Sequence, residues 1–310
     1  MADFSLIKID GKPLEKLIDV ISKGIGTIYK PRAIKKEAEA KAYEIEIIER
    51  AKSKAIAEGK EIDALTLDKI QERFIHRETK RQNNIDNVTQ IAAEQISQED
   101  EISEEPVDED WSTRFFNIVE DISDEEMQKL WGRILAGEVK QPKSFSLRTL
   151  ELLKNLSKIE AEVFTLASTL VISSRNSPFL FRGEDNEALT KYGFTFEHRL
   201  LLTELGILQA ETNITRNFKT LTNDYVTYFE SGKYLIKALK KANSEGNNLP
   251  IYRFSKIGEE LLKLINSNIN DYYIKEFGAV LNSYQLDVEF VYIIDKKNGE
   301  YIHTQPWLKF

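Results

Sequence analysis

The residues best suited to chemistry are four carboxylates in the middle of the chain: Asp124, Glu125, Glu126 and Glu138. Clustered carboxylates could bind a divalent cation and so support a metal-dependent enzyme. The first three, however, follow Ser123 at the expected start of a helix, where acidic side chains interact favourably with the helix dipole. A structural role is therefore the favoured interpretation, and we predict no catalytic residue and no metal ligand here.

Other chemistry-bearing residue types are scarce. The chain has no cysteine, which excludes disulfides, thiolate metal ligands and a cysteine nucleophile. Its three histidines, His76, His198 and His303, are far apart in sequence, which disfavours a zinc site. The sequence contains no catalytic motif, so no cofactor is predicted. An enzyme whose site the sequence does not reveal is the second alternative.

Four lysines could contact nucleic acid: Lys233, Lys237, Lys240 and Lys241. They lie in and after an expected β-hairpin, which is preceded by a helix over 196–208 and followed by a helix that starts at Ser255. This order is typical of a winged helix, which often places its second helix in the DNA major groove. The candidate recognition helix carries too few basic residues for phosphate contacts. A DNA-binding regulator is therefore the first alternative, and nucleic acid is disfavoured as a partner.

An amphipathic helix is predicted over residues 13–28, because apolar residues recur there at helical spacing. The stripe consists of Leu14, Leu17, Ile18, Ile21, Ile25 and Ile28. Lysines 16, 23 and 30 follow one flank, as on a helix that lies on an anionic membrane. Glu15 and Asp19 dilute that charge. We therefore expect the protein itself or a sister subunit to cover the stripe, with a membrane surface as the alternative.

Residues 32–98 predict long helices in a hairpin or stalk. Their apolar seam is an imperfect, coiled-coil-like heptad pattern, represented by Ile34, Ile45, Ile48 and Ile70. Helices with so few apolar positions are rarely stable alone. We therefore expect a partner helix from another protein or, preferably, from a second copy, which makes the chain a homo-oligomer.

Charge divides the chain at one short block. Residues 99–126 contain 13 acidic residues and one basic residue, Arg114, whereas the flanks carry net charges of only +1 and +3. The part over 99–110 includes Pro106 and few apolar residues, which predicts an acidic linker. The expected regions are a helical arm (1–98), this linker (99–110), a helical block (111–172) and a winged-helix-like α+β domain (173–310).

The helical block carries a resemblance to a known family. Ser123 and Glu126 fit a capping box, and Ser157 is expected to cap the helix over 158–172. The segments WSTRFF (111–116), SDEEMQKLW (123–131), ILAGE (134–138) and SFSLRTL (144–150) are similar to the bacterial family called domain of unknown function 2806. The resemblance implies no established activity and no catalytic residue. Relatives of similar layout among phage-defence proteins suggest that biological context.

The end of the chain predicts a β-hairpin, because Asn298–Gly299 separates two β-branched runs and favours a type I′ turn. We therefore expect a mainly α protein with a smaller α+β part. No apolar run is long enough for a membrane span and the first 13 residues are not a signal peptide, so a cytoplasmic or membrane-peripheral location is expected. The expected function is a non-enzymatic bacterial interaction protein that oligomerises through its amino-terminal helices.

Overall fold

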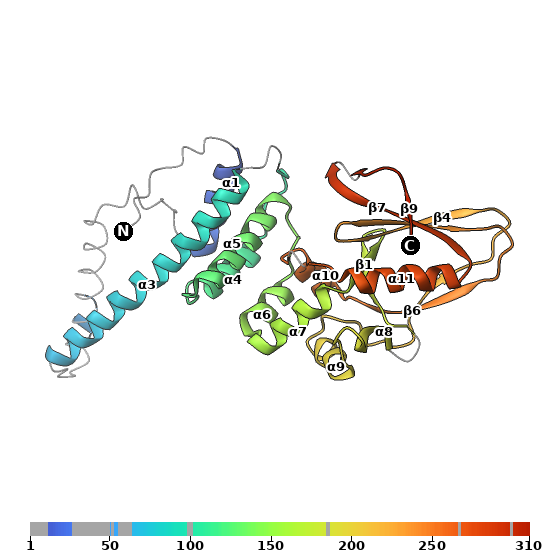
Figure 1. Cartoon of the computed structure of the whole chain (residues 1–310). Coiled ribbons are helices and arrows are strands. Elements are labelled where there is room, and N and C mark those ends of the chain that lie inside the picture. The colour runs from blue at the N-terminus through green and yellow to red at the C-terminus, as the bar shows by residue number, and fades with distance from the viewer. Residues whose placement is uncertain are drawn as a thin grey trace. The chain divides into compact units, whose positions relative to one another are not determined.

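The computed structural model describes residues 12–26, 50, 53–54, 64–97, 102–183, 187–265, 268–297 and 300–310. The chain forms two compact units, Met1–Leu150 and Glu151–Phe310 (Figure 1). This division lies inside the helical block expected over 111–172, and not at the acidic stretch 99–110.

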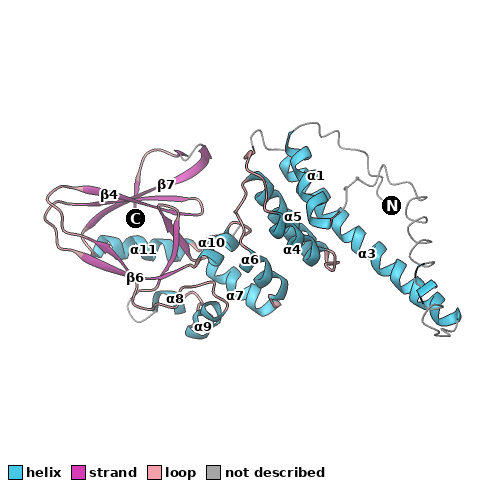
Figure 2. Cartoon of the chain, turned by 180° about the vertical axis from the view of Figure 1, so that it is seen from behind, coloured by secondary structure: helices cyan, strands magenta, loops and turns pink. Residues whose placement is uncertain are grey.

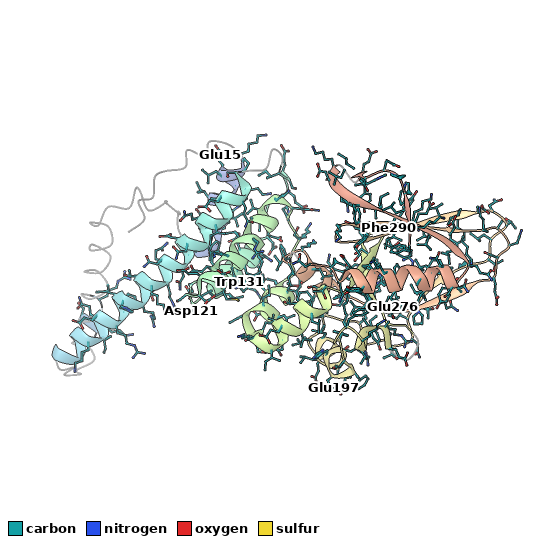
Figure 3. The ribbon with its side chains drawn as sticks, viewed as in Figure 1. Glu15, Asp121, Trp131, Glu197, Glu276 and Phe290 are labelled. Atoms are coloured by element: carbon teal, nitrogen blue, oxygen red, sulfur yellow. The ribbon has the colours of Figure 1, made fainter. Side chains whose placement is uncertain are left out.

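In the described part of the first unit, the packed helices are α1 (Lys12–Ile25), α3 (Ala64–Ile96), α4 (Glu109–Val119) and α5 (Glu125–Lys140). Helix α1 packs on α4, and α3 packs on α5. Aromatic rings fill the core between them, with Phe115 stacked 5.0 Å from Trp111 and edge-on at 5.5 Å from Trp131. Trp131 is fully buried (Figure 3). Helix α6 (Leu147–Asn155) follows and spans the division between the units.

A buried polar network fixes how α3 meets the turn between α4 and α5. The Gln128 amide donates to Asn84 Oδ1 at 3.2 Å and to the Ile122 carbonyl at 2.9 Å, and Asn84 Nδ2 donates to the Glu120 carbonyl at 2.8 Å. The expected cap at Ser123 is wrong by one residue, since Asp124 accepts the Met127 N–H instead.

The described part of the acidic stretch, residues 102–110, is held against the first unit. Lys16 donates to the Ser103 carbonyl at 2.8 Å, and the Ser103 N–H donates to the Lys140 carbonyl at 2.9 Å. Val107 is buried, and Asp108 caps α4. The stretch therefore contributes backbone and side chains to the unit's packing.

The second unit contains a nine-stranded antiparallel sheet, which overturns the expectation of a mainly α chain with a small winged-helix domain. The strands are β1 (Val171–Ser174), β2 (Ser177–Phe181), β3 (Thr215–Phe218), β4 (Tyr225–Ser231), β5 (Tyr234–Lys240), β6 (Asn247–Arg253), β7 (Leu286–Lys297), β8 (Glu300–His303) and β9 (Leu308–Lys309). Their order is β3-β6-β2-β1-β4-β5-β7-β8, with β9 paired to β7. The expected wing, β4–β5, is an interior hairpin because β5 also pairs along its whole length with β7.

The sheet is strongly curved around helix α11 (Asp271–Ser283) (Figures 1 and 2). Strands β3 and β1 are separated by two others, yet Arg216 of β3 donates to the Ser174 hydroxyl of β1 at 2.8 Å. On α11, Phe277 lies 5.1 Å from the Phe229 ring, and the buried Tyr273 hydroxyl bonds both the N–H and the carbonyl of Phe181. These rings form the core of the unit.

The shorter helices of the second unit are α7 (Lys158–Ser168), α8 (Glu187–Thr190), α9 (Phe196–Glu204) and α10 (Lys256–Leu262). The predicted cap at Ser157 is confirmed, and the helix expected to start at Ser255 forms with Ser255 as its cap. Helix α9 ends at Glu204 and not at the predicted residue 208. Gly206, two residues after its end, adopts a φ of 70°. The terminal hairpin is confirmed by the pairing of Lys297 with Glu300, although its Asn298–Gly299 turn lies outside the described residues.

Candidate functional site

Two arginines lie against one tyrosine ring in the second unit. The guanidinium carbon of Arg182 is 5.7 Å from the centre of the Tyr252 ring, and that of Arg199 is 5.3 Å from the same centre. The two positive charges are therefore no more than about 11 Å apart. Such a pair of cations could hold an oxyanion or two neighbouring anionic groups.

Regular structure positions all three side chains. Tyr252 lies on β6 opposite Leu180 of β2, and Arg182 follows β2 with its N–H donated to the Pro250 carbonyl at 3.2 Å. Arg199 lies on α9, whose start is capped by Thr195. The cluster is therefore held by a sheet on one side and a capped helix on the other.

Among the residues that the structure describes, no acidic side chain neutralises the charges of Arg182 and Arg199. Arg199 is 8% exposed, and the Nε atoms of both Arg182 and Arg199 are buried without a hydrogen-bond partner. Within the described part of the chain, neither side chain forms an ion pair with an acidic residue. A guanidinium stays charged at any physiological pH, so the ring contacts are its main compensation. Their unused N–H groups give the cluster the capacity to bind an anion.

Apolar side chains on α9 accompany this charge at the surface. Phe196 is 56% exposed and its ring centre lies 5.8 Å from the Arg199 guanidinium carbon, while Leu200 is 45% exposed one helical turn later. Large exposed apolar residues beside an arginine are common features of interaction surfaces. We call Arg182, Arg199, Tyr252, Phe196 and Leu200 the α9 surface.

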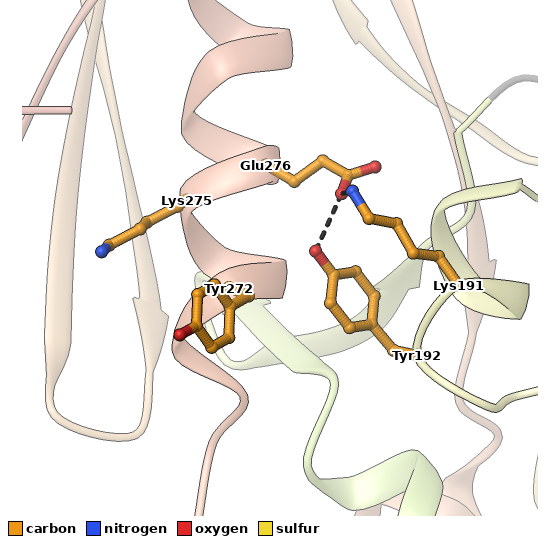
Figure 4. A pocket seen from close by; sticks show the side chains of 5 residues that line it. All are labelled: Lys191, Tyr192, Tyr272, Lys275 and Glu276. Atoms are coloured by element: carbon orange, nitrogen blue, oxygen red, sulfur yellow. Dashed lines mark hydrogen bonds and ion pairs between the residues drawn. The ribbon is translucent and has the colours of Figure 1, made fainter.

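An open pocket of about 540 Å³ lies between the α8–α9 connection and α11 (Figure 4). Lys191, Tyr192, Tyr272, Lys275 and Glu276 line it. Both Lys191 and the Tyr192 hydroxyl donate to the same Glu276 oxygen, at 2.7 and 2.8 Å. The Tyr272 ring is 75% exposed. This combination suits contact with a polar or planar group.

The titratable groups of this pocket are poorly tuned for proton transfer. Burial and the hydrogen bond to Glu276 raise the pKa of Tyr192, and the same carboxylate raises the pKa of Lys191. A catalytic acid or base works best with a pKa near the operating pH, and both shifts lead away from neutrality. The pocket is therefore better suited to binding than to acid–base catalysis.

The four carboxylates singled out in the sequence take structural positions. Asp124 caps α5, with Glu125 and Glu126 in its first turn. Glu138 is 2% exposed and accepts the N–H groups of Lys143 and Phe145. Across the described residues, no group of three or more His, Cys, Asp or Glu side chains could hold a metal ion.

The predicted interface residues separate into four groups by their burial and by whether the structure describes them. Leu17 and Ile21 are buried within the first unit, where α1 packs on α4, whereas Leu14, Ile18 and Ile25 are half-buried. Ile70 is 59% exposed on α3. The remaining four, Ile28, Ile34, Ile45 and Ile48, lie outside the described residues. No helix in the described part of the chain is both long and apolar enough to cross a membrane.

The four lysines predicted to contact nucleic acid all have partners within the second unit. Lys233 pairs with Asp271 at 3.0 Å, Lys237 with Glu289 at 2.9 Å, and Lys241 with Asp224 at 3.1 Å. Lys240 is buried and donates to Asn247 Oδ1 at 2.6 Å and to the Tyr284 carbonyl at 3.2 Å. They stabilise turns and strand pairs and do not form one free basic patch.

Sequence reasoning missed the α9 surface. Arg182, Arg199 and Tyr252 are separated by 17 and 53 positions and form no motif. Arg199 is one of the few basic residues on the candidate recognition helix, and its local sequence gives no sign of the cluster. The side chains of Arg182 and Tyr252 come together because β2 pairs with β6, and no local sequence pattern specifies that pairing.

Comparison with known proteins gives one match. A family model described as "Protein of unknown function (DUF2806)" matches residues 68–277, which is more than half of the chain and includes the whole α9 surface. No curated protein and no solved structure matches the chain.

Proposed function

Because the chain belongs to the DUF2806 family of proteins of unknown function, we propose a function from its own residues. The protein is a non-enzymatic interaction protein. Its α9 surface captures a partner protein segment in which an acidic or phosphorylated side chain lies beside an apolar one. The observation that carries this proposal is Arg199, a nearly buried guanidinium without an acidic partner among the described residues.

The energetics support a binding role for this arginine. A buried charge without a counter-charge costs several kcal/mol, by order of magnitude, and such groups are usually paired or functional. Contacts with the Tyr252 and Phe196 rings offset only part of this cost. An anionic side chain from a partner would supply the missing charge and accept hydrogen bonds from the guanidinium.

The neighbouring residues favour a protein segment as the occupant. Exposed Phe196 and Leu200 offer apolar contact that a free oxyanion would not use. Glu197, on the same helix, is fully charged near neutral pH because backbone and Thr195 hydrogen bonds lower its pKa (Figure 3). A nucleic-acid backbone requires a cluster of basic side chains, and this helix carries an acidic residue next to Phe196 instead.

The amino-terminal unit is proposed to serve assembly. The exposed Ile70 on α3 supports a partner for this helix, and self-association through residues 32–98 stays a prediction. The cytoplasmic location and the phage-defence context also stay predictions.

An array of short peptides tests the α9 surface. Each peptide carries Asp, Glu or phosphoserine beside Leu or Phe, and a matched neutral peptide carries Asn, Gln or Ser. The full chain should bind the anionic–apolar peptides, and Arg199→Met and Phe196→Ala should each weaken binding roughly tenfold, as for central contacts of an interface.

Arg253→Met is the matched control, because Arg253 is exposed on the same strand as Tyr252. This variant should bind like the original chain. Equal binding to anionic and neutral peptides would contradict the proposal. Salt-sensitive binding to duplex DNA that Arg199→Met does not alter would favour the DNA-binding alternative instead.

A further inference from the structure

Arg216 belongs to β3, the strand at one end of the sheet. The curvature of the sheet brings its side chain close to β1 and β4, which lie in the middle of the strand order. The guanidinium carbon of Arg216 lies 4.9 Å from the centre of the Phe229 ring on β4. Its Nη2 donates to the Ser174 hydroxyl of β1 at 2.8 Å. The side chain is half-buried on the same face of β3 as the buried Phe218. The curvature therefore places a half-buried cation against an aromatic ring.

No acidic side chain among the described residues pairs with Arg216. A guanidinium has five N–H donors, and within the described residues that of Arg216 makes one hydrogen bond, to a neutral hydroxyl. Ser174 in turn donates to the Tyr228 carbonyl at 2.8 Å, so this hydroxyl is fixed by the sheet. By contrast, Arg81 in the first unit contacts both Glu120 and Asp121.

A second arginine, Arg175, acts electrostatically on Arg216. Burial lowers the pKa of Arg216, and the nearby charge of Arg175 lowers it further. Arg175 and Asn176 form the turn between β1 and β2 with φ values of 51° and 60°, as in a type I′ turn. The turn conformation holds Arg175 next to the strand end that carries Ser174. The turn therefore places the backbone of Arg175 directly after Ser174, with the Arg175 side chain exposed to solvent.

We propose that Arg216, Arg175 and Ser174 form a binding site for a small oxyanion of the phosphate class. Planar guanidinium groups donate paired hydrogen bonds to phosphate oxygens, and the Ser174 hydroxyl orients one of them. This site is independent of the α9 surface, because it uses other strands and another aromatic ring. Among its three residues the site contains no exposed apolar side chains like those of α9 that would contact a protein segment. We therefore expect its ligand to be a single oxyanion or a terminal phosphate.

Isothermal titration of the full chain with inorganic phosphate and with glycerol 3-phosphate tests the site. Phosphate or the monoester should bind, and Arg216→Met should weaken binding roughly tenfold or more, because hydrogen bonds to charged groups are lost. Arg175→Ser should weaken it by a smaller factor. Binding of the free anion and not of the ester, or the reverse, would identify the source of the phosphate.

Two controls keep the test decisive. Arg253→Met should leave phosphate binding unchanged, because this exposed arginine of β6 belongs neither to this site nor to the α9 surface. Arg114→Ser removes an arginine already paired with Asp110 and should also have no effect. Thermal unfolding without phosphate shows that each variant is folded. Equal phosphate affinity for Arg216→Met and the original chain, or no binding of either probe at millimolar concentration, would overturn the proposal.

Discussion

Replacing Arg199 by methionine should stabilise the second unit in the absence of any ligand. Methionine retains an unbranched apolar stem of similar length, so most of the packing around the stem is kept. What disappears is a nearly buried charge whose Nε–H has no acceptor. A role in binding predicts this gain, because binding residues are often retained at a cost in stability.

The expected change in the free energy of unfolding is the difference between two opposing contributions. An N–H buried without an acceptor costs about 1–3 kcal/mol. The ring contacts at 5.3 and 5.8 Å return about 0.5–1 kcal/mol each. The net gain in the free energy of unfolding is therefore about 1 kcal/mol. For a unit of this size, that corresponds to a rise of about 2–4 °C in Tm.

Differential scanning calorimetry of the full chain measures this change, with Arg253→Met as the control for loss of a surface charge. The control should shift Tm by less than about 1 °C, because surface substitutions rarely exceed a few tenths of a kcal/mol. If Arg199→Met instead lowered the free energy of unfolding by 1 kcal/mol or more, Arg199 would be a structural residue. The reasoning behind the α9 surface would then fail.

Three further predictions concern packing, titration and assembly. Gly132→Ala should destabilise the first unit by about 1–3 kcal/mol in urea unfolding, because the new Cβ would lie 2.5 Å from the Ile91 side chain; no change would mean that α3 and α5 separate easily. Burial raises the pKa of Tyr273 well above its ordinary value, so its phenol ionises more readily in the unfolded chain. Stability should therefore fall as pH rises above about 10, and Tyr273→Phe should reduce that slope in alkaline unfolding curves while lowering stability at pH 7. Ile45→Asp with Ile48→Asp should shift the mass measured by light scattering toward the monomer, and a chain already monomeric at micromolar concentration would contradict self-association.

Local patterns predicted local structure well. The stripe over 13–28 has a helical period, and α1 forms over Lys12–Ile25 with Leu17 and Ile21 in the core. Ser157 caps α7 because its side chain satisfies the N–H of Glu160, a contact between residues three positions apart. The same holds for the terminal hairpin, whose strands are adjacent in sequence.

The sheet was missed because its pairings join distant segments. Strand β2 is buried along nearly its whole length and so shows no alternation, and β6 contains Pro250, which argues against an interior strand. Strand β6 nevertheless pairs with β2 and β3 on its two sides. The α9 surface and the Arg216 site both depend on these pairings, so neither could be predicted from sequence alone.

The place of α11 in the chain has a consequence for synthesis. Strands β1 to β6 are translated before residues 271–283, which supply Phe277 and Tyr273 to the concave face of the sheet. Until that helix leaves the ribosome, the rings of Phe179, Phe181 and Phe229 lack their main cover. Nascent chains with exposed apolar strands are prone to aggregation. Chains ending before residue 271 should therefore require chaperones, whereas the amino-terminal helices can pack while translation continues.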